Sequence, residues 1–166
     1  SGKSYRAYLE SHIRTVSFGG PYLWMKDMMP DNKKKDAKKD GTVAYVENMV
    51  DPSTIWLLKP YAEPDSPMMF RLGVMIHEAR HSEGGGWPHV NCPIGSKPST
   101  LVGKPACDTT PYGAYGVGGI FLKNVALHCT NCTDKVREDA ALYGNKQLSR
   151  IISLKGKQQL REDFGQ

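Results

Sequence analysis

The chain lacks several features that mark common classes of protein. No apolar run reaches the roughly 20 residues that cross a bilayer, so we expect no membrane span. No segment repeats at a fixed period, which argues against a solenoid. A phosphate-cradling glycine loop and a serine- or cysteine-based triad pattern are also missing. What is left is a chain of 166 residues, 39% of them hydrophobic, enough for one domain over residues 1–166 with a real core.

Positive charge exceeds negative charge, and much of the excess is local. The net charge is +5. Lysines cluster in residues 31–41, which we expect to be a solvated loop. No aromatic residues interleave with these lysines, as a single-stranded nucleic-acid site would require. We therefore do not expect nucleic acid as a partner, and the sequence leaves the oligomeric state open.

The four cysteines form an even set, which favours disulfides and an oxidising compartment. Cys92 and Cys107 bracket a loop rich in proline, glycine and serine, of the kind that a bridge staples. Cys129 and Cys132 form a C-x-x-C pair, which a small-ring disulfide, a redox pair or half of a zinc site could each explain. We expect the neighbour pairing, Cys92 with Cys107 and Cys129 with Cys132, in a secreted or periplasmic protein.

The first half of the chain predicts a helix and a small sheet. Apolar spacing indicates an amphipathic helix over residues 4–15. Residues 42–47 and 54–58 predict two strands, with a turn at residues 51–53. An apolar helix is expected next, with Asp65-Ser66-Pro67 as its capped start.

The second half predicts mostly helix. After a structureless loop from Trp87 to Thr110, we expect a helix over 110–127, in which Gly113, Gly116 and Gly119 allow close approach to a neighbouring helix. Two further helices are expected over 133–142 and 146–154, broken at Gly144, followed by a frayed polar tail from Lys155. The expected fold class is α+β, mainly helical with a small mixed or antiparallel sheet.

One short motif carries the chemistry. Residues 77–81 read His-Glu-Ala-Arg-His, and residues four apart share one face of a helix, so His77 and His81 can hold one metal ion. Glu78 follows His77 and can reach a water on that metal. Gly84 can end the helix in a left-handed conformation, after which the chain can return His89 as a third nitrogen ligand. Three protein ligands and one open position are typical of catalytic zinc.

The segment HEARHSEG resembles the HExxHxxG motif of the zincin metallopeptidases and is closest to the metzincin pattern HExxHxxGxxH. The resemblance covers about 13 residues and implies a zincin-like active-site helix, with His77, His81 and His89 as zinc ligands and Glu78 as general base. The sequence departs from the metzincin pattern in two ways. The third histidine comes two residues later, and no methionine follows Met75 to form the family's methionine turn.

Several roles at this site stay open. Glu138 or Glu83 could replace His89 as third ligand, as carboxylates do in other zincins. Tyr112 or Tyr115 could donate a hydrogen bond to a developing oxyanion, although packing explains either residue. We retain Tyr115 as the candidate catalytic tyrosine. Asp108 could orient a histidine ligand through its second nitrogen.

The sequence thus predicts a zinc-dependent peptidase that acts on a protein or peptide substrate. One alternative is a DNA-associated protease of the Spartan type, which predicts reduced cysteines. Another is a binding domain that keeps zinc and lacks turnover. His12 and His128 are expected to be surface, packing or helix-end residues rather than ligands.

Overall fold

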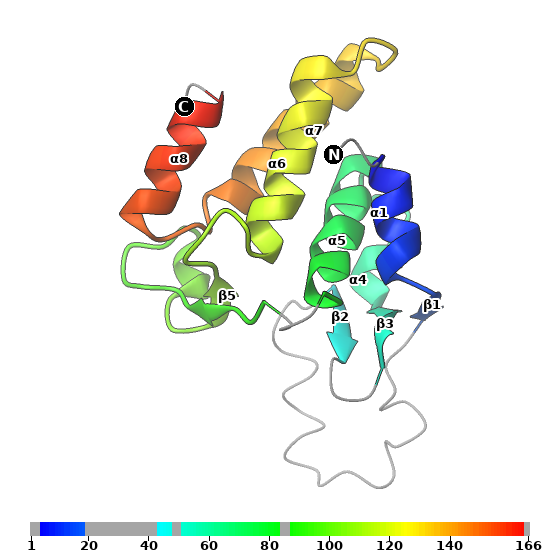
Figure 1. The fold of residues 1–166 in the computed structure, drawn as a ribbon, viewed down its shortest axis with the longest axis horizontal. Coiled ribbons are helices and arrows are strands. Elements are labelled where there is room, and N and C mark those ends of the chain that lie inside the picture. Colours follow the sequence, from blue (N-terminus) through cyan, green and yellow to red (C-terminus); the bar gives the residue numbers. More distant parts are fainter. Residues whose placement is uncertain (1–3, 19–42, 48–50, 84–86, 165–166) are drawn as a thin grey trace, which may run out of the picture.

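The computed structural model describes residues 4–18, 43–47, 51–83 and 87–164. The protein is mainly helical, with one three-stranded and one two-stranded sheet, so the predicted α+β class is confirmed (Figure 1). The basic segment 31–41 and Gly84 lie outside the described residues. Within the described part of the chain, no helix is both long enough and apolar enough to cross a membrane.

The N-terminal half forms a small mixed sheet with α1 (Tyr5–His12) at its edge. The strand order is β1 (Thr15–Phe18), β3 (Asp51–Leu57), β2 (Ala44–Glu47); β1 runs parallel to β3, and β2 runs antiparallel to it. Ile55 and Leu57 of β3 pack with Ala44 and with Val74 of the following helix. The sheet therefore buries one face against the helix that carries the H-E-x-x-H motif.

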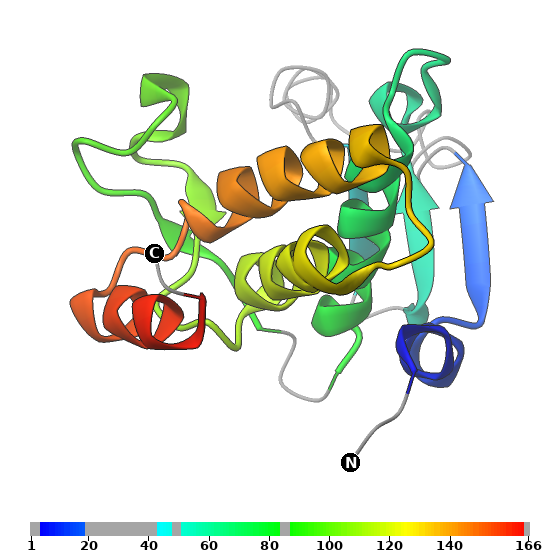
Figure 2. The same cartoon turned by 90° about the horizontal axis from the view of Figure 1, so that it is seen from above.

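That helix is α5 (Met68–His81), which follows the short α4 (Lys59–Ala62). Its other side packs against α6 (Ala114–His128) and α7 (Asp134–Leu148), as the view from above shows (Figure 2). On this side a hydrophobic cluster joins Met69 and Ile76 of α5 to Phe121, Leu122 and Ala140. The motif helix is thus buried from two sides, by the sheet and by the α6–α7 pair.

The segment after the H-E-x-x-H motif is held together by a disulfide and a short β-sheet. It contains β4 (Val90–Asn91), a 3-10 turn (Ser99–Leu101) and β5 (Pro105–Cys107), and β4 pairs antiparallel with β5. The Cys92–Cys107 disulfide closes this segment, and a second disulfide joins Cys129 to Cys132 between α6 and α7. The predicted pairing is confirmed, and no described cysteine is free. The expectation of a structureless loop was wrong, because the bridge and the β4–β5 pairing order it.

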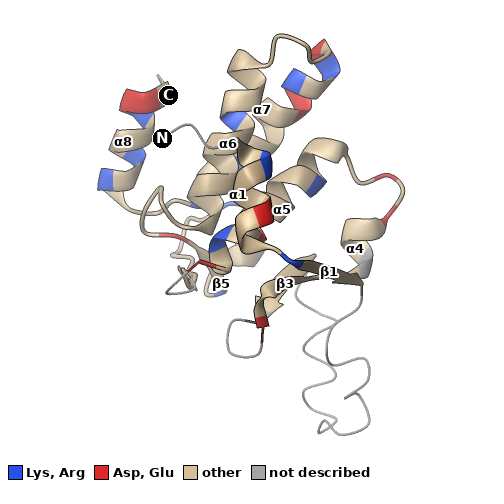
Figure 3. Cartoon of the chain, turned by 45° about the vertical axis from the view of Figure 1, so that its right-hand side comes forward, with Lys and Arg blue, Asp and Glu red and all other residues tan. Residues whose placement is uncertain are grey.

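The chain ends in α8 (Leu154–Phe164), where we expected a frayed tail. Lysines and arginines recur along this helix (Figure 3), and Lys155, Lys157 and Arg161 are exposed. Leu160 is nonetheless buried with Leu148 and Ile151, so α8 is held by an apolar stripe that its polar composition hides.

Several predicted boundaries were wrong for local reasons. The first helix stops at His12 because Ile13 is extended and leads into β1, a strand the sequence did not reveal. Residues 51–53 begin β3 rather than forming a turn; the Asp51 carboxylate accepts hydrogen bonds from Ser53 and Thr54 there. Helix α5 has Pro67 as its N-cap, without a side-chain cap from Asp65 or Ser66.

The glycines also differ from expectation. Helix α6 starts only at Ala114, and a Cβ at Gly116 would overlap the Pro111 carbonyl, while one at Gly113 would overlap Asp108. Gly119 faces α7; the contact with the motif helix is made instead by Gly118, near the backbone of Gly73. Gly144 does not break α7, since it fits against α6 in mid-helix.

Candidate metal centre

Helix α5 presents two histidines on one face. His77 and His81 are one turn apart, and their Nε2 atoms lie 3.2 Å from each other. His77 is 7% exposed, whereas His81 is half-buried near the end of the helix. Ser82 continues in a helical conformation, and its backbone N–H donates a hydrogen bond to the Glu78 carbonyl. The last helical turn, which carries His81, therefore keeps its hydrogen bonding.

His89 completes a triangle. Its Nε2 lies 3.1 Å from Nε2 of His81 and 3.2 Å from Nε2 of His77. Two nitrogens bound to tetrahedral zinc at about 2.0–2.1 Å would stand about 3.3 Å apart. The three atoms therefore have the separations of three corners of a zinc tetrahedron. These residues form the group that could hold a metal ion among the described residues.

The protonation of His89 is set by Asp108. Nδ1 of His89 lies 2.7 Å from Oδ1 of Asp108. An ionised carboxylate only accepts hydrogen bonds, so Nδ1 carries the proton and donates it. The lone pair of His89 then lies on Nε2, directed at the other two histidines. Metal-bound histidines commonly have such a partner on their second nitrogen.

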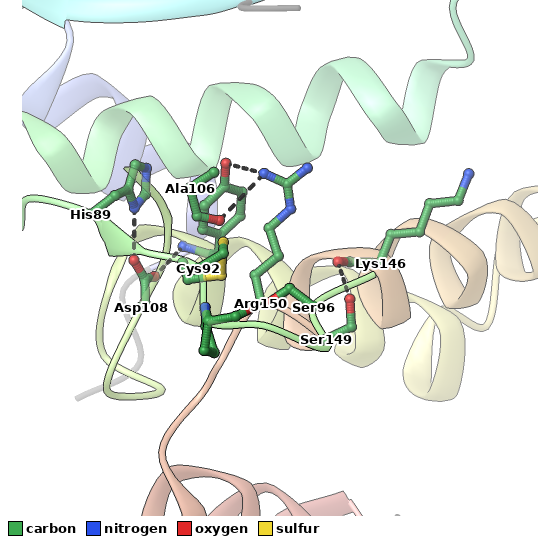
Figure 4. Close-up of a disulfide and its surroundings, with 11 residues drawn as sticks. His89, Cys92, Ser96, Ala106, Asp108, Lys146, Ser149 and Arg150 are labelled. Carbon is green, nitrogen blue, oxygen red and sulfur yellow. Dashed lines mark hydrogen bonds and ion pairs between the residues drawn. A yellow bond between two sulfur atoms is a disulfide. The ribbon is translucent and has the colours of Figure 1, made fainter. Parts of the chain in front are cut away.

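Asp108 is itself held rigidly (Figure 4). The residue is 3% exposed, and Oδ2 accepts a hydrogen bond from the Tyr115 backbone N–H at 2.8 Å. Its backbone pairs with the segment after α7, donating to Arg150 O and accepting from Ile152 N. Cys107 precedes it and is bridged to Cys92, which lies three residues after His89, so the disulfide joins the chain next to Asp108 to the chain near His89.

The surroundings keep His77 neutral. Burial lowers the pKa of His77 well below its usual value, and the His81 and His89 rings and the Arg150 cation lower it further. A neutral imidazole is the form that binds a metal. Nδ1 of His77 is buried and has no hydrogen-bond partner in the described part of the chain, whereas Nδ1 of His89 has Asp108. Three imidazoles with converging Nε2 atoms suit a cation at their centre, and this donor set fits zinc.

Glu78 is the second residue of the motif and is 5% exposed. Burial raises the pKa of its carboxyl to about 8. Desolvation therefore increases the proton affinity of this carboxylate, as a general base requires. A cation at the histidines would oppose this shift, because it favours the charged carboxylate.

Tyr115 contacts the histidines with its ring. The ring stacks on His89 at 4.6 Å between centroids and meets His77 edge-on at 4.3 Å. Its hydroxyl accepts a hydrogen bond from Nη1 of Arg150. Tyr115 thus packs against the rings of His77 and His89. Tyr112 is exposed, with its hydroxyl accepting from Gln159.

The competing carboxylates lie elsewhere. Glu83 accepts hydrogen bonds from Tyr8 and Arg80, and Glu138 is exposed on α7. Neither belongs to the three-residue group. His12 is bonded to the Tyr8 carbonyl, and His128 ends α6, so both occupy the positions expected of non-ligands.

Two arginines at this centre were missed from sequence. Arg80 lies 4.0 Å from the Trp87 ring centroid and donates to the Tyr112 carbonyl, which ties α5 to the segments on either side of His89. Trp87 has a positive φ of 44°, so the chain turns sharply just before His89. Arg150 covers Tyr115 from the far end of α7. Arg80 lies inside the motif, but its contacts depend on the fold, and Arg150 has no motif at all.

Comparison with protein-family models, curated proteins and solved structures returned no match. The fold and the site together define a mainly helical α+β protein with a three-histidine group able to hold a metal ion.

Proposed function

We propose that the protein is a zinc-dependent peptidase that hydrolyses peptide bonds in a protein or peptide substrate. The single observation that supports this most is the triangle of His77, His81 and His89 Nε2 atoms, with the buried residue Glu78 directly after His77 in the chain. A structural zinc site usually has four protein ligands. Three histidines leave one corner for water or substrate.

The chain's own residues divide the work. When bound, a zinc ion supplies the Lewis acidity that lets water act as a nucleophile near neutral pH. Glu78 takes the proton that the attacking water loses and returns it to the leaving amine. Asp108 holds His89 in the tautomer that a metal needs, and the Tyr115 ring fixes His77 and His89 against each other.

The setting that suits the protein is secreted or periplasmic. Both cysteine pairs are bridged, and structural disulfides persist mainly in oxidising compartments. The Spartan-type alternative predicts reduced cysteines and is therefore less favoured. The zinc-binding domain without turnover gives no reason for burying Glu78, the residue directly after His77.

The test is a metal analysis combined with a peptide-library cleavage assay. We expect about one zinc per chain and hydrolysis that stops on chelation and returns with zinc. Zinc at full occupancy without cleavage of any library member would favour the non-catalytic alternative. Four alkylatable thiols after non-reducing purification would favour the intracellular one.

A further inference from the structure

Arg150 lies one aromatic ring away from the histidine triangle. Its guanidinium carbon is 4.4 Å from the Tyr115 ring centroid, and that ring contacts His77 and His89. The residue follows α7 in a tight connection whose backbone is bonded to Asp108. The cation is therefore fixed beside the candidate metal centre by the same segment that orients His89.

The charge of Arg150 is not neutralised by the described residues. Its two hydrogen bonds go to the Tyr115 hydroxyl and, at 3.5 Å, to the Ala106 carbonyl. No carboxylate in the described ranges makes an ion pair with it. Asp108, whose backbone N–H donates to the Arg150 carbonyl, uses one carboxylate oxygen for His89 and the other for the Tyr115 N–H. A partly buried cation normally has an anionic partner, because desolvation is costly.

The guanidinium still has donors to offer. Both contacts use Nη1, so Nη2 and Nε make no hydrogen bond to a described residue. Neither atom is among the buried polar atoms without a partner, and Arg150 as a whole is half-buried, so neither nitrogen is fully enclosed. Two adjacent N–H donors on a planar guanidinium match a carboxylate in a bidentate geometry.

We infer that Arg150 is a specificity-determining residue that binds a carboxylate of the substrate next to the bond to be cut. The inference rests on the proposed peptidase function and adds a substrate class to it: peptides with a negative charge close to the scissile bond. That carboxylate can be the C-terminal one of a short peptide or the side chain of an Asp or Glu. A neutral, amidated peptide would leave the guanidinium without its partner.

The test measures binding in a protein that does not turn over. Zinc-loaded Glu78→Gln protein is titrated calorimetrically with three acetylated alanine tetrapeptides: a free acid, an amide, and an amide ending in Glu. We expect at least one acidic peptide to bind about tenfold or more tightly than the neutral amide, since charge-assisted hydrogen bonds are the strong ones. The free-acid and Glu arms show which carboxylate is used.

Variants then assign the preference to Arg150. In Arg150→Met the ratio of acid to amide affinity should fall to about one, and Arg150→Lys should restore part of it. Arg161→Met on α8 removes the same charge away from the centre and should keep the ratio. Tyr115→Phe removes the hydroxyl that Arg150 contacts and keeps the cation, so a loss there would indicate a packing role instead.

The outcomes separate the two proposals. If the wild-type protein cuts acidic and neutral peptides equally well, or Arg150→Met keeps the preference, the specificity role is wrong and the peptidase stands. If no peptide is bound or cut by zinc-loaded protein, the peptidase proposal fails and the inference falls with it.

Discussion

Nδ1 of His89 donates a hydrogen bond to Oδ1 of Asp108 across 2.7 Å, so the His89 ring is oriented by a buried carboxylate 19 residues later in the chain. Removing that charge should weaken metal binding without emptying the site. We expect Asp108→Asn to lower zinc affinity about 10- to 100-fold, the usual effect of losing such a partner. Competition with a chromophoric chelator measures it. An unchanged affinity would mean that the hydrogen bond does not contribute to zinc binding.

The three histidines are each expected to be needed for zinc. His77→Ala, His81→Ala and His89→Ala should each lose bound zinc on dialysis, since a two-ligand site is much weaker. Glu138→Ala is the matched control, because Glu138 is exposed on α7 and should leave occupancy at about one ion per chain. Atomic absorption measures the zinc content per chain of each dialysed variant. Stoichiometric zinc in His89→Ala, with an empty site in Glu138→Ala, would move the third ligand to the carboxylate.

Glu78 should serve the reaction and not the metal. Glu78→Gln keeps the size of the side chain but cannot accept a proton from water. We expect full zinc occupancy and a fall in hydrolysis of at least about 10²-fold. Parallel zinc analysis and peptide cleavage test both parts. Wild-type cleavage by Glu78→Gln would remove Glu78 from the mechanism.

The two disulfides should differ in their effect on the site. Replacing Cys92 and Cys107 by Ser opens a 15-residue separation, which costs about 3 kcal/mol in the chain-entropy model, and frees the segment that holds His89 and Asp108. Both stability and zinc affinity should fall. The Cys129→Ser, Cys132→Ser variant is the control. That disulfide joins two cysteines only three positions apart, in the connection between α6 and α7 rather than in the segment that carries His89. Equal losses of zinc affinity in the two variants would contradict the coupling.

Two glycines provide a test of helix packing. Gly116→Ala would place a Cβ on the Pro111 carbonyl, and backbone cannot move aside as a side chain can. We expect a loss of about 2 kcal/mol or more in unfolding free energy. Gly144→Ala, whose nearest neighbours stand at 3.3 Å, should change stability by less than about 1 kcal/mol. Urea denaturation by circular dichroism compares them.

The sequence carried the local features of the site. The spacing of His77 and His81 set them on one helix face, and the proline- and glycine-rich stretch between Cys92 and Cys107 indicated the bridge. Both depend on residues close together in the chain. The placement of His89 followed from the reach of the intervening glycines, and the structure brings its Nε2 to the other two.

Features that depend on distant partners were not predictable in the same way. The strand β1 exists because Thr15–Phe18 pairs in parallel with β3, which no local pattern announces. Because glycine weakens helices, the sequence predicts a break at Gly144, yet close contact with α6 offsets that cost. Arg150 reaches Tyr115 only because the end of α7 folds back to Asp108.

The position of α5 between two apolar clusters bears on how metal would enter and leave. Val74 faces the sheet, and Ile76 faces α6 and α7. Because buried helices are the last elements to unfold locally, we expect the turns that carry His77 to resist local unfolding. His89 lies on a short segment with exposed neighbours, which can open by itself. Exchange of bound metal can therefore proceed by release of one ligand while the other two keep their spacing. The rate of exchange would then follow the local opening of the bridged segment, and not global unfolding.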